Sequence, residues 1–325
     1  MFNISATKSF NEVHAEVIAR ADRMLPDEIV HVSDLSMDVA GNISGSHTPS
    51  FCLNDWSRKQ LASLLGIRWT KWFSTVTPEE RAEEVSRRFQ RTPGELKIRA
   101  WRDDTGTADG VARAFLSPNY TAIDDARVFE RLAMNLREGL DEFRFSSTDE
   151  TDSTTVYDAV RADSMDLDGD VLYPGWGLRN SEVAGAALTL DDYFLRQVCT
   201  NGMVVTLKSR SLYRTHRHIE DDHLSAAMVL ALGRLPIRWK AALNMMRASR
   251  SIELPHPDAV VAAVLDTPEV PKALSLKAQE VVLRDGDHTR FGVLQAVTYV
   301  AHAVNADPHV KFVMERLAGE FLAAA

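Results

Sequence analysis

Basic and aromatic side chains alternate along residues 95–102, whose sequence is ELKIRAWR. Lys97, Arg99 and Trp101 fall at every second position, so a strand would present all three on one face. Lysine and arginine neutralise phosphate charges, and an aromatic ring stacks on a nucleobase whatever its identity. This combination is typical of a surface that binds single-stranded nucleic acid.

A second segment with the pattern of a strand carries the same combination of residue types. Lys208, Arg210 and Arg214 lie on one side of it, and Tyr213 is adjacent. Neighbouring candidate strands and loops add further cations and rings. The full set of candidate nucleic-acid-binding residues is Lys97, Arg99, Trp101, Arg113, Tyr120, Trp176, Arg179, Lys208, Arg210, Tyr213, Arg214 and Arg217. The alternative is an ordinary solvated sheet face, with Trp101 packed under a helix.

Three histidines, His216, His218 and His223, lie close together in the sequence. A His-x-His pair on a strand would place both imidazoles on one face, which is a workable geometry for a metal ion. Arg214 and Arg217 would repel a cation at that place. A solvated polar junction between a strand and a helix is therefore the alternative.

Common catalytic signatures are absent from the sequence. It contains no GxxxxGK[ST] loop, no GxSxG, no HExxH and no paired CxxC. Gly175 begins like a dinucleotide-binding fingerprint, but Asn180 replaces the third glycine. The acidic stretch 164–170 lacks the spacing of a calcium loop, because Gly177 stands where a bidentate glutamate is needed. We therefore expect neither a metal nor a cofactor, and an enzyme is not favoured.

Charge is distributed unevenly along the 325 residues. The formal net charge is −9, so nucleic acid could bind only to a local basic patch. Residues 138–192 contain 14 acidic residues and three arginines, whereas residues 200–250 contain nine lysines or arginines and three acidic residues. The acidic segment, with Asp163, Asp166, Asp168 and Asp170, is a second candidate interaction surface.

The N-terminal half alternates between predicted helices and strands. Residues 1–30 predict a short amphipathic helix, and the Ser- and Gly-rich residues 31–50 predict a flexible connection. Thr77-Pro78-Glu79-Glu80 has the pattern of a capping box with proline at the first helical position. The further elements expected here are helices near 55–66, 77–91 and 124–136 and a hairpin of strands 95–102 and 111–116.

The region 175–217 looks like the centre of the fold. It predicts a strand over 175–183, a return strand over 186–190 and a hairpin over 197–205 around Asn201-Gly202. Strands at 143–145 and 154–160 precede it, around acidic loops. After His223 the pattern becomes helical, with expected helices at 222–234, 236–250, 257–265, 272–284, 289–304 and 308–323.

Together these elements predict an α+β fold with an antiparallel β-meander or hairpin core, packed helices and an all-helical C-terminal part. We expect an N-terminal helix with a flexible connection over 1–50, a mixed core over 51–220 and a helical region over 221–325 packed on that core. Cys52 and Cys199 fit no metal or redox spacing. Neither a signal core nor a membrane span is evident, so a reducing, cytoplasmic location is expected.

Two strings of residues resemble a known family. One is Arg113-Ala-Phe-Leu-Ser117 followed by Tyr120 and Ile123-Asp124; the other is Gly175-Trp176, Arg179-Asn-Ser-Glu-Val183 and Arg196-Gln-Val-Cys-Thr-Asn-Gly-Met203. These strings, with Phe291–Thr298 and Leu317-Ala-Gly319, are similar to the phage/plasmid-like protein family called domain of unknown function 932. The resemblance spans about residues 51–322.

The resemblance implies a protein encoded by a phage, prophage or conjugative plasmid and located in the bacterial cytoplasm. Such elements often carry single-strand annealing proteins that assemble as rings or filaments, an analogy at the level of the fold only. The leading hypothesis is therefore a homo-oligomeric DNA-metabolism protein that binds single-stranded DNA and anneals strands. The alternatives are a protein-interaction module that uses its acidic surface against a host or phage protein, and a metal-dependent enzyme that uses the histidine cluster.

Overall fold

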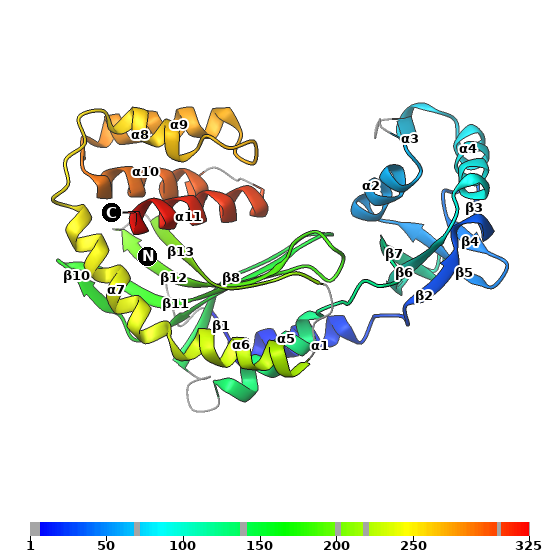
Figure 1. Cartoon of the computed structure of the whole chain (residues 1–325), viewed down its shortest axis with the longest axis horizontal. Coiled ribbons are helices and arrows are strands. Elements are labelled where there is room, and N and C mark those ends of the chain that lie inside the picture. Colours follow the sequence, from blue (N-terminus) through cyan, green and yellow to red (C-terminus); the bar gives the residue numbers. More distant parts are fainter. Residues whose placement is uncertain are drawn as a thin grey trace.

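The computed structural model describes residues 7–67, 72–136, 142–198, 203–216, 221–303 and 307–324, without the side chains of residues 73–74, 196–198, 203–211 and 221–222. Two β-sheets divide this part of the chain into two lobes (Figure 1). The chain begins in the lobe that we call the large lobe, crosses to the small lobe and then returns. The small lobe spans about residues 28–116.

The sheet of the large lobe is antiparallel throughout its described pairings. Its strand order is β1-β8-β9-β11-β12-β13, and β10 pairs with β11 outside that path. The strands are β1 (Lys8–Ser9), β8 (Phe143–Glu150), β9 (Thr155–Arg161), β10 (Met165–Leu167), β11 (Asp170–Asn180), β12 (Leu188–Val198) and β13 (Met203–Arg214). The long β11–β12–β13 meander is present, as the sequence predicts, but residues 181–183, predicted as the end of a strand, lie in the loop after β11.

Helices cover both faces of this sheet. They are α1 (Phe10–Ala21), α5 (Asp125–Asn135), α6 (Asp221–Gly233), α7 (Leu235–Ser249), α8 (Pro257–Val264), α9 (Lys272–Asp285), α10 (Arg290–Ala303) and α11 (Pro308–Ala323). In Figure 1, α10 and α11 lie over one face, α1, α5, α6 and α7 lie under the other, and α8 and α9 form an outer layer. One cluster of buried residues runs from Phe10 through Trp176 to Leu322, so sheet and C-terminal helices share a core.

The small lobe has its own sheet and its own core. The strand order is β2-β6-β7-β5-β4-β3, and β5 and β7 are parallel. The strands are β2 (Glu28–His31), β3 (Leu35–Met37), β4 (Ile43–Gly45), β5 (Thr48–Leu53), β6 (Glu95–Arg102) and β7 (Gly110–Leu116). A 3-10 turn, η2 (Val32–Asp34), and the helices α2 (Asp55–Leu64), α3 (Trp72–Thr75) and α4 (Pro78–Arg91) complete it.

The α+β fold with an all-helical C-terminal part is confirmed. From residue 55 onward, each predicted helix begins and ends within two residues of its observed counterpart, whereas the helix predicted within residues 1–30 spans only Phe10–Ala21. Local chemistry explains this accuracy at α4. Thr77 Oγ1 accepts from the backbone N–H of Glu80, and the Glu80 carboxylate accepts from the backbone N–H of Thr77, which completes the capping box.

Two predicted loops are strands instead. Residues 31–50 form β3 and β4, because Leu35 and Ile43 point into the core and Asp38 closes the turn by accepting from Asn42 N–H at 2.8 Å. The acidic stretch 164–170 forms the hairpin β10–β11, whose two turn residues Asp168 and Gly169 have φ of 52° and 92°. Asp-Gly is a preferred pair for such a turn.

Candidate functional site: the junction and cleft between the lobes

The loop between β11 and β12, residues 181–187, joins the large lobe to the small lobe; we call it the junction loop. Trp56 Nε1 and Gln60 Nε2 of α2 both donate to the Val183 carbonyl at 3.0 Å. The Val183 side chain is buried against Ala114 of β7. Because these contacts combine hydrogen bonds with apolar packing, they hold the loop firmly in the small lobe.

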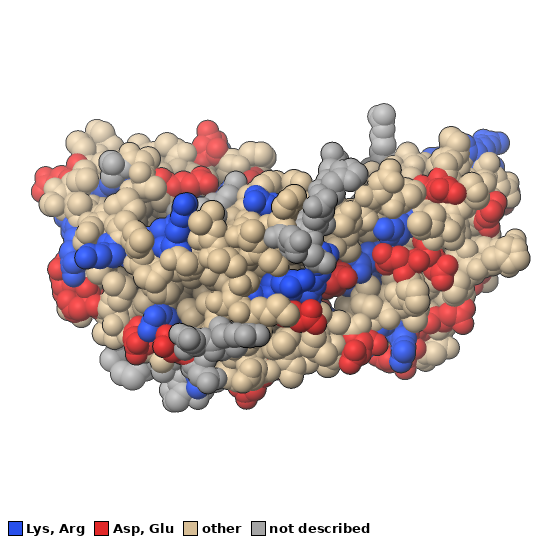
Figure 2. Space-filling view, turned by 60° about the horizontal axis from the view of Figure 1, so that its bottom comes forward, with Lys and Arg blue, Asp and Glu red and all other residues tan. Residues whose placement is uncertain are grey.

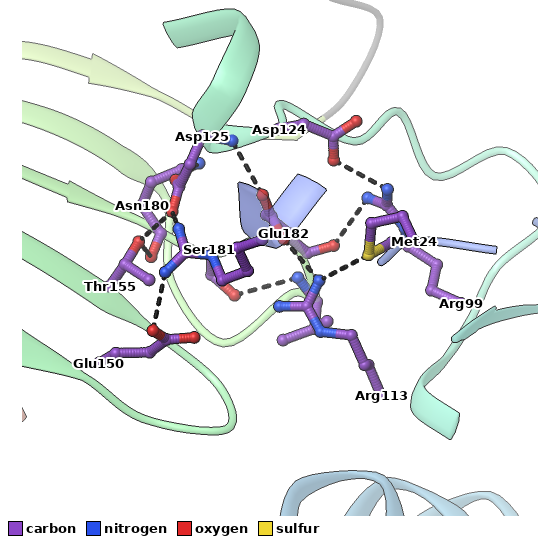
Figure 3. Close-up of polar contacts among 12 residues, drawn as sticks. Met24, Arg99, Arg113, Asp124, Asp125, Glu150, Thr155, Asn180, Ser181 and Glu182 are labelled. Carbon is purple, nitrogen blue, oxygen red and sulfur yellow. Dashed lines mark hydrogen bonds and ion pairs between the residues drawn. The ribbon is translucent and has the colours of Figure 1, made fainter. Parts of the chain in front are cut away.

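Glu182 of the junction loop contacts residues of both lobes (Figure 3). Its carboxylate accepts from Arg113 at 2.5 Å and from the backbone N–H of Asp125 at 2.9 Å, and its carbonyl accepts from Arg99 at 3.0 Å. Burial works to raise the pKa of the Glu182 carboxyl, but the charge and hydrogen bond of Arg113 outweigh it and leave that pKa lowered. The ionised Glu182 carboxylate is therefore a partner for Arg113, and the Glu182 carbonyl is a partner for Arg99.

Arg99 and Arg113, which the sequence assigns to phosphate contacts, are buried. Arg99 is 4% exposed and pairs with Asp27 at 3.1 Å and Asp124 at 2.8 Å. Arg113 is 5% exposed and lies over the Trp101 ring, 4.1 Å from its centroid. The prediction of phosphate binding is wrong for both, because protein acids and backbone carbonyls already surround them.

The other two residues of the predicted strand face also contact the protein. The Trp101 ring lies between Arg23 and Arg113, at 5.2 Å and 4.1 Å from their guanidinium carbons. Lys97 Nζ donates to the Tyr120 carbonyl at 2.8 Å. The alternation along β6 thus places these residues on one face, but that face lies against the junction.

A buried polar network continues from the junction into the large lobe around Asp125. Its carboxylate accepts hydrogen bonds from Arg20 at 2.6 Å, Asn180 at 2.7 Å, Thr155 at 2.8 Å and Tyr157 at 3.0 Å. Burial raises the pKa of Asp125, and the charge of Arg20 opposes that shift. Four donors from β9, β11 and α1 converge on one carboxylate, so this network fixes the base of the junction loop.

Two predicted binding residues of β11 lie away from the junction. Trp176 is 0% exposed and packs edge-on against Phe145 in the core, so it cannot stack on a base. Arg179 is half-buried on the other face, with Nη2 2.7 Å from His309 Nδ1 and its guanidinium over the Phe312 ring. Trp176 is a structural core residue, and Arg179 connects β11 to α11.

A cleft of about 750 Å³ opens beside the junction loop, between the lobes. Gln60 and Phe115 line it from the small lobe, and Ala184–Ala187, Tyr213 and His216 line it from the large lobe. No lysine, arginine, aspartate or glutamate is among the described residues that line it. The cleft is therefore suited to a neutral, planar group that stacks, and it does not itself neutralise phosphate.

Tyr120 and His216 form an ordered pair at the wall of this cleft. Their rings stack with centroids 5.4 Å apart and an interplanar angle of 7°. The Tyr120 hydroxyl donates to the Ser181 carbonyl and accepts from Ala184 N–H, both at 3.2 Å. His216 is 6% exposed and accepts through Nδ1 from Ile123 N–H at 3.3 Å.

Two predicted residues line this cleft, Tyr120 and Tyr213, and Arg214 follows Tyr213 at the end of β13. Tyr213 is 46% exposed, and the neighbouring Arg214 is exposed and donates to the Tyr213 carbonyl at 2.9 Å. Ala184, in the cleft wall, has a φ of 62°, which an L-residue adopts only under strain. Strained backbone of this kind is concentrated at functional sites, which favours the cleft as the site.

Burial and the nearby charge of Arg99 lower the pKa of His216 to about 4, from 6.5. Between about pH 4 and pH 6.5, His216 is therefore protonated in the unfolded chain but not in the folded chain. Stability should fall as the pH drops from 6.5 towards 4, by about 1.4 kcal/mol per pH unit for one proton. Urea unfolding of wild type and His216→Gln at several pH values checks this. Parallel pH profiles for the two proteins would contradict it.

Three predicted cations lie where the structure gives no side chain. The backbone of Lys208 pairs with Tyr193 and that of Arg210 with Asp191 in the β12–β13 ladder. The side chains of Lys208 and Arg210, and all of Arg217, lie outside what is described. Their roles stay predictions.

The histidine cluster does not come together as a metal site in the described part of the chain. His216 is occupied by its stack with Tyr120 and its contact with Ile123. His218 lies outside the described residues. Among the residues that the structure covers, no three His, Cys, Asp or Glu side chains are arranged to hold a metal ion.

The acidic hairpin, residues 163–170, has partners within the chain. Asp168 and Asp170 form ion pairs with Arg250, and Arg247 approaches Asp168 at 3.5 Å. Asp163 pairs with Arg161 at 2.9 Å. These contacts account for much of the acidic charge without an outside partner. Figure 2 shows basic and acidic groups in separate small clusters, with no continuous basic band among the atoms coloured on that face.

Comparison with known proteins gives no relative from which a function could be transferred. No family model, no curated protein and no solved structure matches the chain. Over the described ranges, no helix has both the length and the apolar character needed to cross a membrane.

Sequence reasoning missed Glu182 and Asp125 as the centre of the junction. A signal for them did exist, because the two strings that carry the family resemblance meet there. Arg113–Ser117 and Tyr120 come from one string, and Asn180–Val183 comes from the other. Residues 69 positions apart in the chain thus form one ion pair. No sequence pattern indicated that His216 lies in the cleft wall, because its position depends on the tertiary contact with the Tyr120 ring.

Proposed function

We propose that the protein binds single-stranded nucleic acid, with an unstacked base in the cleft between its lobes and the phosphates outside it. The observation that carries this proposal is the uncharged, aromatic cleft wall with the exposed Arg214 next to Tyr213. Bases are neutral and planar, so they match the wall, whereas phosphates need a cation, for which Arg214 outside the wall is the candidate.

The geometry supports a single strand over a duplex. A base can reach Tyr213 only if it is turned out of its stack, which costs least in a single strand. His216 stays neutral at pH 7 because its pKa is lowered to about 4, so it adds no charge that would attract phosphate into the cleft. Base stacking on aromatic side chains contributes about 1–3 kcal/mol per base.

The family resemblance supports the same proposal, because it implies a phage- or plasmid-encoded protein of DNA metabolism. A more specific form of this proposal is that the protein assembles as a homo-oligomer and anneals complementary strands. DNA is the nucleic acid favoured by that resemblance. The cleft itself offers stacking to DNA and RNA alike.

Tyr213→Ala should weaken binding to a single-stranded oligonucleotide by about 5- to 150-fold, because one stacking contact is lost. Arg214→Ala should weaken binding less at moderate salt and reduce the slope of log K against log salt by about 0.7, because one phosphate contact is lost. Fluorescence anisotropy with labelled single and double strands at two salt concentrations measures both effects.

Tyr299 and Arg284, which lie in α10 and α9 of the helical layer away from the cleft, provide the matched controls Tyr299→Ala and Arg284→Ala. Neither should change affinity or salt slope. Equal losses in the cleft and control variants would contradict the placement of the site. Absence of binding at low salt would overturn the proposed function as a whole.

A further inference from the structure

Helix α6 is apolar on two sides, although only one side faces the core. Leu224, Met228, Ala231 and Leu232 are buried under the sheet of the large lobe. On the outer side, Val229 is 51% and Leu230 is 56% exposed, and Ile237 at the start of α7 is 74% exposed. A helix that is apolar all round is normally covered on all sides, so its outer face indicates a partner.

The outer face also has the shape for close approach of another helix. Ala226 and Gly233 flank Val229 and Leu230 at one-turn spacing, and both are exposed. No atom lies within 4 Å of the place where a Cβ on Gly233 would sit. The face is therefore a shallow apolar strip, Ala226, Val229, Leu230 and Gly233, with open space over its small residues.

We propose that this strip is the contact between two copies of the chain, with the two α6 helices antiparallel across a two-fold axis. The strip is nearly symmetric about its middle, because Ala226 and Gly233 lie at equal distances from the Val229–Leu230 pair. An isologous contact of this kind needs a surface that complements itself. The inference does not depend on the proposed function of the cleft.

Charge along α6 favours the antiparallel arrangement. The helix begins with Asp221 and Asp222 in its sequence and ends beside Arg234, which is exposed and has no ion pair among the described residues. Two antiparallel copies set the acidic, N-terminal end of one helix beside the basic, C-terminal end of the other. The two helix dipoles also oppose each other favourably in that arrangement. A parallel pair would place like charges together.

Sedimentation velocity of the full chain between 1 and 100 μM tests the contact. Wild type should form dimers in this range, and Leu230→Asp should raise the dimer dissociation constant at least about tenfold, because an ionised carboxylate would be buried. Leu283→Asp on α9, where the wild-type leucine is 53% exposed, is the matched control and should leave the constant unchanged. A monomeric wild type, or equal effects of both variants, would overturn the proposal.

Cysteine pairing tests the geometry of the contact separately. In the antiparallel pair, position 226 of one copy faces position 233 of the other. The double variant Ala226→Cys/Gly233→Cys should therefore form a covalent dimer under mild oxidation, and each single variant should not. Positions 226 and 233 are about 10 Å apart along one helix, so they cannot pair within a chain. A covalent dimer of either single variant to the same extent would overturn the antiparallel register.

Discussion

Replacing Asp125 by alanine is expected to lower the free energy of unfolding by about 3–5 kcal/mol, because it leaves Arg20 and three hydrogen-bond donors without a buried acceptor. Asp125 is completely buried, and Arg20 lies 2.6 Å from its carboxylate. Urea unfolding at pH 7, followed by circular dichroism, measures the loss.

Glu150 provides the control for that experiment, since it is the second acid that pairs with Arg20, at 2.8 Å. Its side chain is 46% exposed, so Glu150→Ala should cost no more than about 1 kcal/mol. The cation is the same in both variants, so the difference between them reports burial of the pair together with the three other hydrogen bonds to Asp125. Similar losses for Asp125→Ala and Glu150→Ala would show that the network around Asp125 adds no stability.

The second large effect is expected at Trp176. Trp176→Ala should destabilise the protein by about 3–5 kcal/mol, because it removes the largest fully buried side chain and leaves a cavity against Phe143 and Phe145. Trp176→Phe should cost less, since the Trp176 indole N–H has no hydrogen-bond partner among the described residues and none is lost. Thermal or urea unfolding measures both values.

Comparison of Trp176→Phe with Tyr213→Ala distinguishes a role in the core from a role in binding. Trp176→Phe should fold and bind single-stranded nucleic acid as wild type does, because the ring never reaches the cleft. Tyr213→Ala should show the opposite pattern, with near-normal stability and reduced binding, because Tyr213 is 46% exposed. If Trp176→Phe lost binding while it kept its stability, the assignment of Trp176 to the core alone would be wrong.

Local patterns in the sequence predict the elements well. The capping box at Thr77 and Glu80, the alternation along β6 and the proline at the start of α11 each act within a few residues. Such signals depend on backbone chemistry that the neighbouring residues determine completely. Element type and approximate bounds are therefore available without any knowledge of the tertiary structure.

The surroundings of the basic face of β6 cannot be predicted from such local patterns. Alternation shows that Lys97, Arg99 and Trp101 share a face, but it does not show what covers that face. The cover comes from the junction loop, and Glu182 lies 83 positions after Arg99 in the chain. A buried arginine with an acidic partner and an exposed arginine that can bind a phosphate have the same sequence pattern. Only tertiary contacts distinguish them.

The route of the chain has a consequence for the order of events during synthesis. The small lobe is built from contiguous residues, and all six strands of its sheet precede residue 117. Its sheet can form on the ribosome while the long strands of the large lobe are still untranslated. Arg113 then emerges 69 residues before Glu182, which corresponds to a delay on the order of 3–14 s at ~5–20 residues per second. During that delay a nascent small lobe exposes an uncompensated cation and the apolar surface of β7 at Ala114, which Val183 covers only later. This surface is a natural target for ribosome-associated chaperones.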